Sequence, residues 1–540
     1  MKNRDLIQIG GILFFIGIIL IIVSWLYSYP IHQTSITDIT FYQYYPSLWP
    51  GLVLSFIGLF LIAYYSKNNI VRAICSSIFP LLVYIYAFFF SYIPSSDCGA
   101  VRGMFEVFQK TKIDINAISY FQFPTFFSLN EIIHQIAGIN EKDIALICFI
   151  LYGFLLGLFL YLFFVELKNR YSIQLIPFLL VIIYFIGMFS FLNFQWVPQT
   201  LALVYFFILI YISTYLESPK IKWKLIFILI FTSLVLTHAF IPIIFLSFFS
   251  ILTFKKRNLA TILLTILSIY LIITVFYLTF LLPLYFETFR QSLVGFGGEY
   301  ITTLSASVAE VEGTLNQIIS FANRLIIPMI WIVGAIGTAV LFLKRKMDFI
   351  LISLGLAGGI YLAVGLVYSV LGLRSTKFLF IPLTIGFMFF ISKWKKPTIT
   401  VILIILILSV FGPMRMAYDT TQFQTDEEVN ACNFLSINML NVTNSSIAMN
   451  QVNYGYFFNI NKYLKNHVWV IRPGERGFLN IFKSSLNQNS YILYNSNLGK
   501  EVIVFEMSID RFNNTLKGIM SNNKIYDCGL TYIIKGIEKR

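Results

Sequence analysis

Long apolar segments joined by short basic loops constrain this chain more than any other feature. Hydrophobic residues make up 58% of the sequence and charged residues only 12%, which excludes an ordinary soluble protein. A helix needs about 20 apolar residues to cross the hydrocarbon layer, and it satisfies its own backbone polar groups there. We therefore predict an α-helical polytopic membrane protein with about thirteen transmembrane helices. The predicted spans are 6–27, 49–65, 72–92, 143–165, 173–192, 199–216, 225–237, 240–254, 259–283, 325–343, 349–371, 378–392 and 397–412.

The lysine and arginine residues between these segments indicate the orientation, because basic residues resist translocation. With a cytoplasmic N-terminus, seven short inside loops carry 18 basic residues and the longer outside loops carry eight. We therefore predict that the N-terminus is cytoplasmic. The inside residues are Lys2, Arg4, Lys67, Arg72, Lys168, Arg170, Lys220, Lys222, Lys224, Lys255, Lys256, Arg257, Lys344, Arg345, Lys346, Lys393, Lys395 and Lys396.

Residues 225–254 form one apolar block that can be interpreted in two ways. As a single helix it would be about 45 Å long at 1.5 Å per residue, and it would put Lys224 and Lys255 on opposite faces of the membrane. Two short spans with a break near His238 and Pro242 keep every basic cluster inside. Pro242 also cannot make its helical hydrogen bond. We therefore predict the break, with His238 near the outer surface.

Several other classes of protein or site are not indicated. The first apolar segment has no small-residue cleavage site before Tyr29, so we interpret it as a span rather than a cleaved signal peptide. The net charge of +14 is explained by the inside loops, and we expect no nucleic-acid partner. No cysteine spacing suggests zinc. A disulfide between Cys432 and Cys528 stays open, because it requires that their segment be extracytoplasmic.

The C-terminal segment 413–540 is polar and long enough for a small domain. Its alternation of strand-like and helical runs predicts a small α/β domain, which thirteen spans would place outside. The strand-like runs are 446–450, 467–471, 491–494, 502–505 and one near 524–534, and the helical runs are 426–438, 453–464 and 510–521.

Two long outer loops are predicted, at 93–142 and 284–324. Apolar residues at helical spacing in the first loop predict helices that lie along the membrane surface, and the Gly-rich second loop is expected to be mobile. Loops of this kind are typical of a membrane enzyme that closes over a lipid substrate. The acidic residues Asp38, Glu106, Asp114 and Glu131 are expected to be solvated.

Several segments of the chain together resemble one superfamily. They are Ser96-Asp97 after the third span, 120–140 in the first outer loop, Leu236-Thr-His238 at the break, Leu373-Arg-Ser-Thr-Lys377 in the last short outer loop, 427–435 and 524–529. With them the chain resembles the GT-C superfamily of membrane glycosyltransferases, which use polyprenyl-phosphate-linked sugar donors. The resemblance divides the chain into an added N-terminal transmembrane hairpin (1–71), a GT-C-like transmembrane module (72–412) and the extracytoplasmic α/β domain (413–540).

The resemblance also implies roles for individual residues. Asp97 would act as the general base on an acceptor hydroxyl. Arg374, helped by Lys377, would neutralise the departing lipid phosphate, and His238 would contact the phosphate or the acceptor. The implied partners are the polyprenyl-phosphate-linked sugar donor, a glycan, lipid or protein acceptor, and the bilayer of the cell membrane.

The sequence departs from the superfamily pattern in two places. The first outer loop has no Asp-x-Asp or Glu-x-Asp pair, so no cofactor is assigned and a divalent cation is left open. The tail has no Trp-Trp-Asp-Tyr-Gly run, so transfer to protein asparagine is not expected. Two alternatives are a transporter or flippase of a lipid-linked glycan and a non-catalytic scaffold. A transporter should carry charges within its spans and repeated halves, and neither is evident here.

Overall fold

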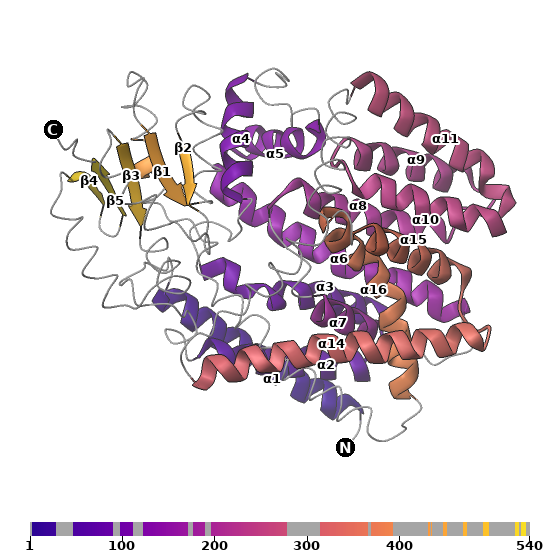
Figure 1. The fold of residues 1–540 in the computed structure, drawn as a ribbon. Coiled ribbons are helices and arrows are strands. Elements are labelled where there is room, and N and C mark those ends of the chain that lie inside the picture. The colour runs from indigo at the N-terminus through magenta and orange to yellow at the C-terminus, as the bar shows by residue number, and fades with distance from the viewer. Residues whose placement is uncertain are drawn as a thin grey trace.

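A computed structural model describes most of the helical region and five short strands of the C-terminal segment (Figure 1). The described residues are 3–28, 47–89, 98–111, 123–170, 176–188, 196–277, 314–365, 369–392, 430–432, 434, 446–450, 468–471, 490–495, 524–528 and 531–535. The longer helices are α1 (Asn3–Ser28), α2 (Leu48–Tyr65), α3 (Asn69–Val83), α4 (Cys98–Thr111), α5 (Pro124–Ala137), α6 (Glu141–Arg170), α7 (Pro177–Gly187), α8 (Pro198–Ser213), α9 (Ile221–Val235), α10 (Ile241–Lys255), α11 (Ala260–Ile272), α14 (Thr314–Leu343), α15 (Phe349–Gly365) and α16 (Ser369–Ser392). Short 3-10 or π-helical turns occupy Ile85–Phe89, Arg257–Leu259 and Ile273–Tyr277.

Every predicted span except 397–412, which lies outside the described residues, overlaps one of these helices. Four described helices are long and apolar enough to cross a membrane, namely Asn3–Tyr27, Leu48–Tyr65, Glu141–Arg170 and Arg257–Val275. Most of the others are apolar but have only 10–17 residues, which at 1.5 Å per residue is shorter than a hydrocarbon layer of about 30 Å. The helical fold is confirmed, while the number of spans stays a prediction.

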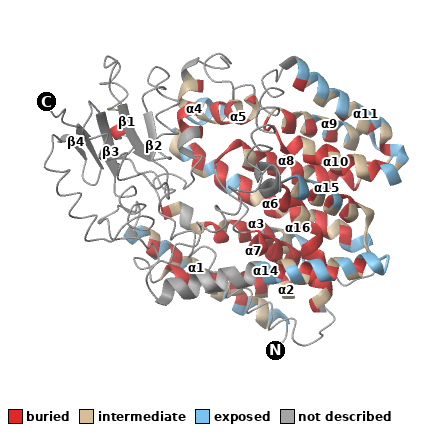
Figure 2. Cartoon of the chain, viewed as in Figure 1, coloured by how far each residue is buried: buried red, intermediate tan, exposed pale blue. Residues whose placement is uncertain are grey.

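The outer surface of the helical region is apolar in many places. Buried residues are concentrated where α3, α6, α7, α8, α10 and α16 meet, whereas α11 carries many exposed residues (Figure 2). These include Leu264 and Leu271, and α1 likewise exposes Phe15 and Leu26. A soluble protein rarely exposes so many large apolar side chains, so this surface suits contact with lipid.

The predicted break in residues 225–254 is confirmed. Helix α9 ends at Val235 and α10 begins at Ile241. The ring centroids of Phe231 and Phe245 are 5.8 Å apart and those of Phe227 and Phe249 are 5.1 Å apart. In one straight helix Phe227 and Phe249 would be about 33 Å apart. Helices α9 and α10 are therefore antiparallel, and the start of α9 lies beside the end of α10.

Two predicted loop boundaries are wrong. Arg374 and Lys377 were expected in a short outer loop, but both lie within helix α16. Hydropathy falls at these residues, yet arginine and lysine are good helix formers, and the helix continues even through Pro382. The second outer loop was expected to reach residue 324, whereas α14 already begins at Thr314.

Helices α15 and α16 are also antiparallel. A Cβ atom added at Gly358 would lie 2.9 Å from Cα of Leu379, and one added at Gly355 would lie 3.6 Å from Cγ of Pro382. Residues later in α15 therefore face residues earlier in α16. The first turns of α16, with Arg374 and Lys377, consequently lie at the end where α15 finishes.

The described strands of the C-terminal segment form one five-stranded sheet in the order β2-β1-β3-β5-β4. Strand β1 pairs in parallel with β2 and β3, while β5 is antiparallel to β3 and β4. The first three predicted strands are confirmed, and the run near 524–534 is a hairpin of two strands. The predicted strand 502–505 and helices 453–464 and 510–521 lie outside the described residues. The strands are β1 (Ser446–Asn450), β2 (Val468–Ile471), β3 (Ser490–Asn495), β4 (Lys524–Cys528) and β5 (Thr531–Lys535).

Candidate functional site

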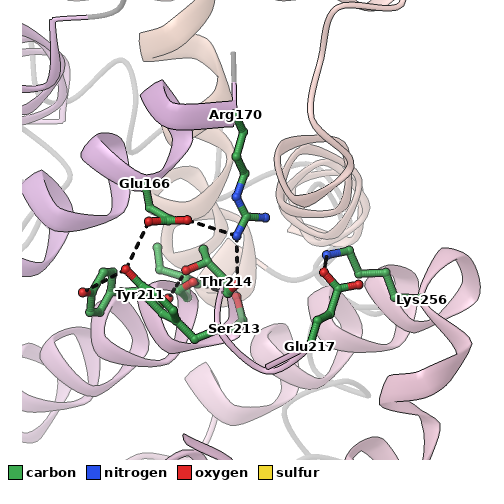
Figure 3. A network of polar contacts seen from close by, with 9 residues as sticks. Glu166, Arg170, Tyr211, Ser213, Thr214, Glu217 and Lys256 are labelled. Carbon is green, nitrogen blue, oxygen red and sulfur yellow. Dashed lines mark hydrogen bonds and ion pairs between the residues drawn. The ribbon is translucent and has the colours of Figure 1, made fainter. Parts of the chain in front are cut away.

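Polar contacts hold several of the basic loops together at one end of the helical region (Figure 3). Arg170 at the end of α6 lies 3.3 Å from the Glu166 carboxylate and donates a 2.7 Å hydrogen bond to the carbonyl of Thr214, just after α8. Lys256, just after α10, forms a 2.7 Å ion pair with Glu217, just before α9. The ends of α6, α8 and α10 and the start of α9 are therefore neighbours.

Two further contacts extend this group of loops. The ammonium of Lys255 lies 5.1 Å from the centre of the Phe349 ring, at the start of α15. Tyr161, near the end of α6, donates a 3.5 Å hydrogen bond to the carbonyl of Asn69, at the start of α3. The basic loops 67–72, 168–170, 220–224, 255–257 and 344–346 thus share one end of the bundle, which we call the basic end. Five of the seven loops predicted inside therefore lie at one end, while their place on the cytoplasmic side stays a prediction.

The opposite end contains α4 and α5, whose helical structure is confirmed. The side-chain oxygen of Asn130 on α5 accepts hydrogen bonds from Trp196 (3.0 Å) and from the Cys148 thiol on α6 (3.2 Å). The Asn130 amide donates to the carbonyl of Phe126 at 2.6 Å, and Phe105 of α4 packs edge-on against Trp196. All these side chains are buried. Both helices are therefore packed into the bundle and form part of its core at this end.

Two acidic residues at this end are closely engaged. Arg102 on α4 forms a 2.7 Å ion pair with Glu141 at the start of α6, and the Arg102 side chain is only 5% exposed. Glu131 was expected to be solvated, but it is buried and accepts a 2.8 Å hydrogen bond from Gln135. That expectation was wrong because Glu131 belongs to the buried part of α5, together with Phe126, Phe127 and Asn130.

Sequence reasoning did not single out the Arg102–Glu141 pair, although α4 carries a signal for it. Val101, Phe105 and Phe108 form the buried stripe of this amphipathic helix, and Arg102 is next to that stripe. An arginine at such a position needs a carboxylate partner or a route to water. The partner is 39 positions away in the sequence, so it could not be identified from spacing.

His238 has a structural role at the break between α9 and α10. Its Nδ1 atom accepts hydrogen bonds from the backbone N–H groups of Phe240 (3.1 Å) and Ile241 (3.4 Å), and so caps the first turn of α10. Because Nδ1 is an acceptor, the neutral ring carries its proton on Nε2. Next to it, the carbonyl of Leu236 accepts a 3.3 Å hydrogen bond from Thr125 at the start of α5. The resemblance to GT-C enzymes implies that His238 contacts the phosphate or the acceptor, and Nε2 is the ring nitrogen that would make this contact.

Lys377 is buried in the same half of the bundle, with 2% of its surface exposed. Its carbonyl accepts a 2.9 Å hydrogen bond from Tyr184 on α7. The next residue, Phe378, packs against Phe206 on α8, which in turn packs against Phe245 on α10. A cation inside an apolar helix is costly and usually functional. Lys377 is thus placed on the core side of α16, toward the end opposite the basic loops.

The side chains of Asp97 and Arg374, the other two predicted site residues, are not described by the structure. Asp97 lies outside the described residues, and helix α4 begins at the next residue. Arg374 is in α16, but its side chain lies outside the described part of the structure. The structure therefore places His238 just before α10 and Lys377 on α16, and Phe206 packs against both of these helices. The geometry of the full site stays a prediction.

Metal binding and similarity to known proteins give no further information about the site. Within the described ranges, no group of three or more His, Cys, Asp or Glu residues could hold a metal ion. Cys432 is buried, whereas the side chain of Cys528 lies outside the described residues. No protein-family model matches the chain, and no curated protein matches its sequence.

Replacing Glu141 by glutamine should lower the free energy of unfolding by about 2 kcal/mol, because it leaves the charge of Arg102 in a buried position. The matched control is Glu166→Gln, also on α6 and also paired with an arginine. Its partner Arg170 is 27% exposed, so the loss should be at most about 1 kcal/mol. Thermal unfolding of the two purified variants in the same detergent measures the difference. Equal losses would show that burial does not strengthen the Arg102–Glu141 pair.

Proposed function

We propose that this chain is a multi-pass membrane glycosyltransferase that moves a sugar from a polyprenyl-phosphate donor to an acceptor on the outer face of the membrane. The observation that carries the proposal is the burial of Lys377 within an apolar helix, toward the end opposite the basic loops. A buried ammonium there is suited to hold the phosphate of a lipid-linked donor whose chain lies in the bilayer.

The proposed topology is a cytoplasmic basic end, thirteen spans and an extracytoplasmic C-terminal domain. Its support is the grouping of the basic loops, since basic residues are retained on the cytoplasmic side. In the ribbon, the sheet lies at the left beside α4, while the turn between α14 and α15 lies at the far right (Figure 1). With the basic end in the cytoplasm, the five strands and the helices predicted between them would form the small α/β domain outside the cell membrane.

The proposed chemistry uses three residues. The acceptor hydroxyl attacks the anomeric carbon of the sugar, and the bond from that carbon to the phosphate oxygen breaks. Asp97 takes the hydroxyl proton as general base. Arg374 and Lys377 are three residues apart on α16 and therefore share one side of the helix. Their two positive charges stabilise the phosphate that leaves with the lipid.

The test is the glycan composition of cells that lack this protein. We expect mass spectrometry of the surface glycans to show the loss of one sugar, and wild-type protein to restore it. If the sugar is kept while a lipid-linked glycan accumulates on the cytoplasmic leaflet, the protein is a transporter. If neither the glycans nor the lipid-linked precursors change, the protein is a scaffold. Either result would overturn the proposed enzyme.

A further inference from the structure

The turn between α14 and α15 has an unusual backbone conformation at an arginine. The backbone N–H of Lys346 donates to the carbonyl of Leu341 (3.0 Å) and that of Arg345 donates to Phe342 (2.9 Å). Arg345 has φ = 52°, a left-handed conformation that glycine usually occupies at the end of a helix. A strained residue of this kind is a reason to look for function. The left-handed residue lies in a tight turn in which Lys344, Arg345 and Lys346 are all exposed.

A fourth cation is held next to this turn. The Lys255 ammonium lies over the ring of Phe349 at 5.1 Å, and Phe349 begins α15 three residues after Lys346. The acidic residue of the turn, Asp348, uses one carboxylate oxygen to accept a 2.8 Å hydrogen bond from the backbone of Ile350. The four cations outnumber this one carboxylate, so the net local charge is positive. We call Lys255 and Lys344–Lys346 the basic turn cluster.

Exposed apolar side chains adjoin the cluster in the sequence. Phe254 is 82% exposed, Phe342 is 57% exposed and Leu343 is 78% exposed. Each belongs to a helix end that continues directly into the cations. Apolar side chains followed by lysine or arginine are typical of the membrane interface, where the former meet acyl chains and the latter meet headgroups.

We propose that the basic turn cluster binds the phosphate headgroup of an anionic phospholipid, with an acyl chain against Phe342 and Leu343. Charge complementarity favours an anionic headgroup, and the exposed apolar residues favour a lipid over a soluble phosphate. The proposal rests on the membrane embedding in the proposed function and not on sugar transfer. A protein that proves inactive as a transferase can still bind the lipid.

The orientation of the chain in the membrane does not by itself require that these cations be held in a tight turn. The rule that retains basic residues in the cytoplasm depends on their number and on their distance from the spans, and a flexible loop satisfies it. Lys220, Lys222 and Lys224 at the start of α9 meet the same rule at the same end of the bundle. They therefore provide a control with an equal change of charge.

The experiment compares two triple variants of the purified full chain in detergent. One is Lys344→Gln/Arg345→Gln/Lys346→Gln and the control is Lys220→Gln/Lys222→Gln/Lys224→Gln. Native mass spectrometry measures the binding of phosphatidylglycerol and of phosphatidylcholine. We expect the wild-type protein to prefer phosphatidylglycerol, the first variant to bind it about a hundredfold more weakly, and the control to stay within about threefold of wild type.

Equal weakening in both variants would mean that only the overall charge matters, and it would overturn the site. Equal binding of both lipids by the wild type would overturn the headgroup selectivity. A phosphatidylglycerol complex displaced by inorganic phosphate at millimolar concentration would identify a soluble anion as the ligand instead. If the first variant does not fold, Arg345→Gly removes one charge and relieves the left-handed strain. It should keep or raise the Tm and still weaken phosphatidylglycerol binding about fivefold.

Discussion

Replacing Lys377 by methionine should reduce sugar transfer by about a hundredfold or more while still giving a folded protein in the membrane. The loss is expected because a charged group that stabilises a leaving phosphate typically contributes this much to the rate. Methionine keeps the apolar stem of lysine, so the variant should still fold and insert, although it loses the contacts of the ammonium group. Glycan mass spectrometry in the complemented deletion strain and thermal unfolding of the purified protein measure the two quantities.

The matched control for Lys377 lies two turns further along the same helix. Thr384 is buried, and its hydroxyl donates to the carbonyl of Phe380 within α16. Thr384→Val should therefore leave sugar transfer at the wild-type level, apart from a small change in Tm. Lys377→Arg keeps the charge and should retain part of the activity. Full transfer by Lys377→Met would exclude the lysine from the phosphate site.

The break between α9 and α10 could be predicted because two independent signals coincide there. Pro242 disfavours a continuous helix, and only a break keeps Lys224 and Lys255 on the same side of the membrane. The structure agrees through contacts that the sequence does not reveal, such as the packing of Phe227 on Phe249. Signals that are local and mutually consistent are those that sequence reasoning uses well.

The errors at the opposite end have a common cause. Hydropathy predicts that Arg374, Lys377 and Glu131 are exposed, because a hydropathy scale treats every charged residue as solvated. In the structure, Lys377 and Glu131 are buried, since neighbouring helices cover them. Burial of this kind depends on contacts such as Trp196 with Asn130, which are 66 positions apart. No local window includes both partners.

The C-terminal sheet shows the same division between local and distant information. Alternating apolar residues identify strands such as Ser446–Asn450, because the pattern lies within each strand. The order of the strands does not follow from it, since β1 lies between β2 and β3. The pattern near 524–534 predicts a single strand, because only two residues separate β4 from β5 in the sequence.

Asp97→Asn should abolish sugar transfer, with a loss of about a hundredfold to ten thousandfold. Asparagine keeps the size and polarity of the side chain, but its amide cannot accept the proton of the attacking hydroxyl as a general base does. Glycan mass spectrometry in the deletion strain, complemented with the variant, measures the loss, and the amount of protein in the membrane fraction shows whether insertion is preserved.

The control for Asp97 is Glu106→Gln, which removes one negative charge from α4, the helix that follows Asp97. We expect transfer close to the wild-type level, because no catalytic role is proposed for Glu106. If Glu106→Gln is inactive and Asp97→Asn is active, the general base would be Glu106 and not Asp97. Full activity of Asp97→Asn with normal insertion would remove the general base from the proposed mechanism. Transfer would then depend on a different base, while Lys377 would keep its proposed role at the lipid phosphate.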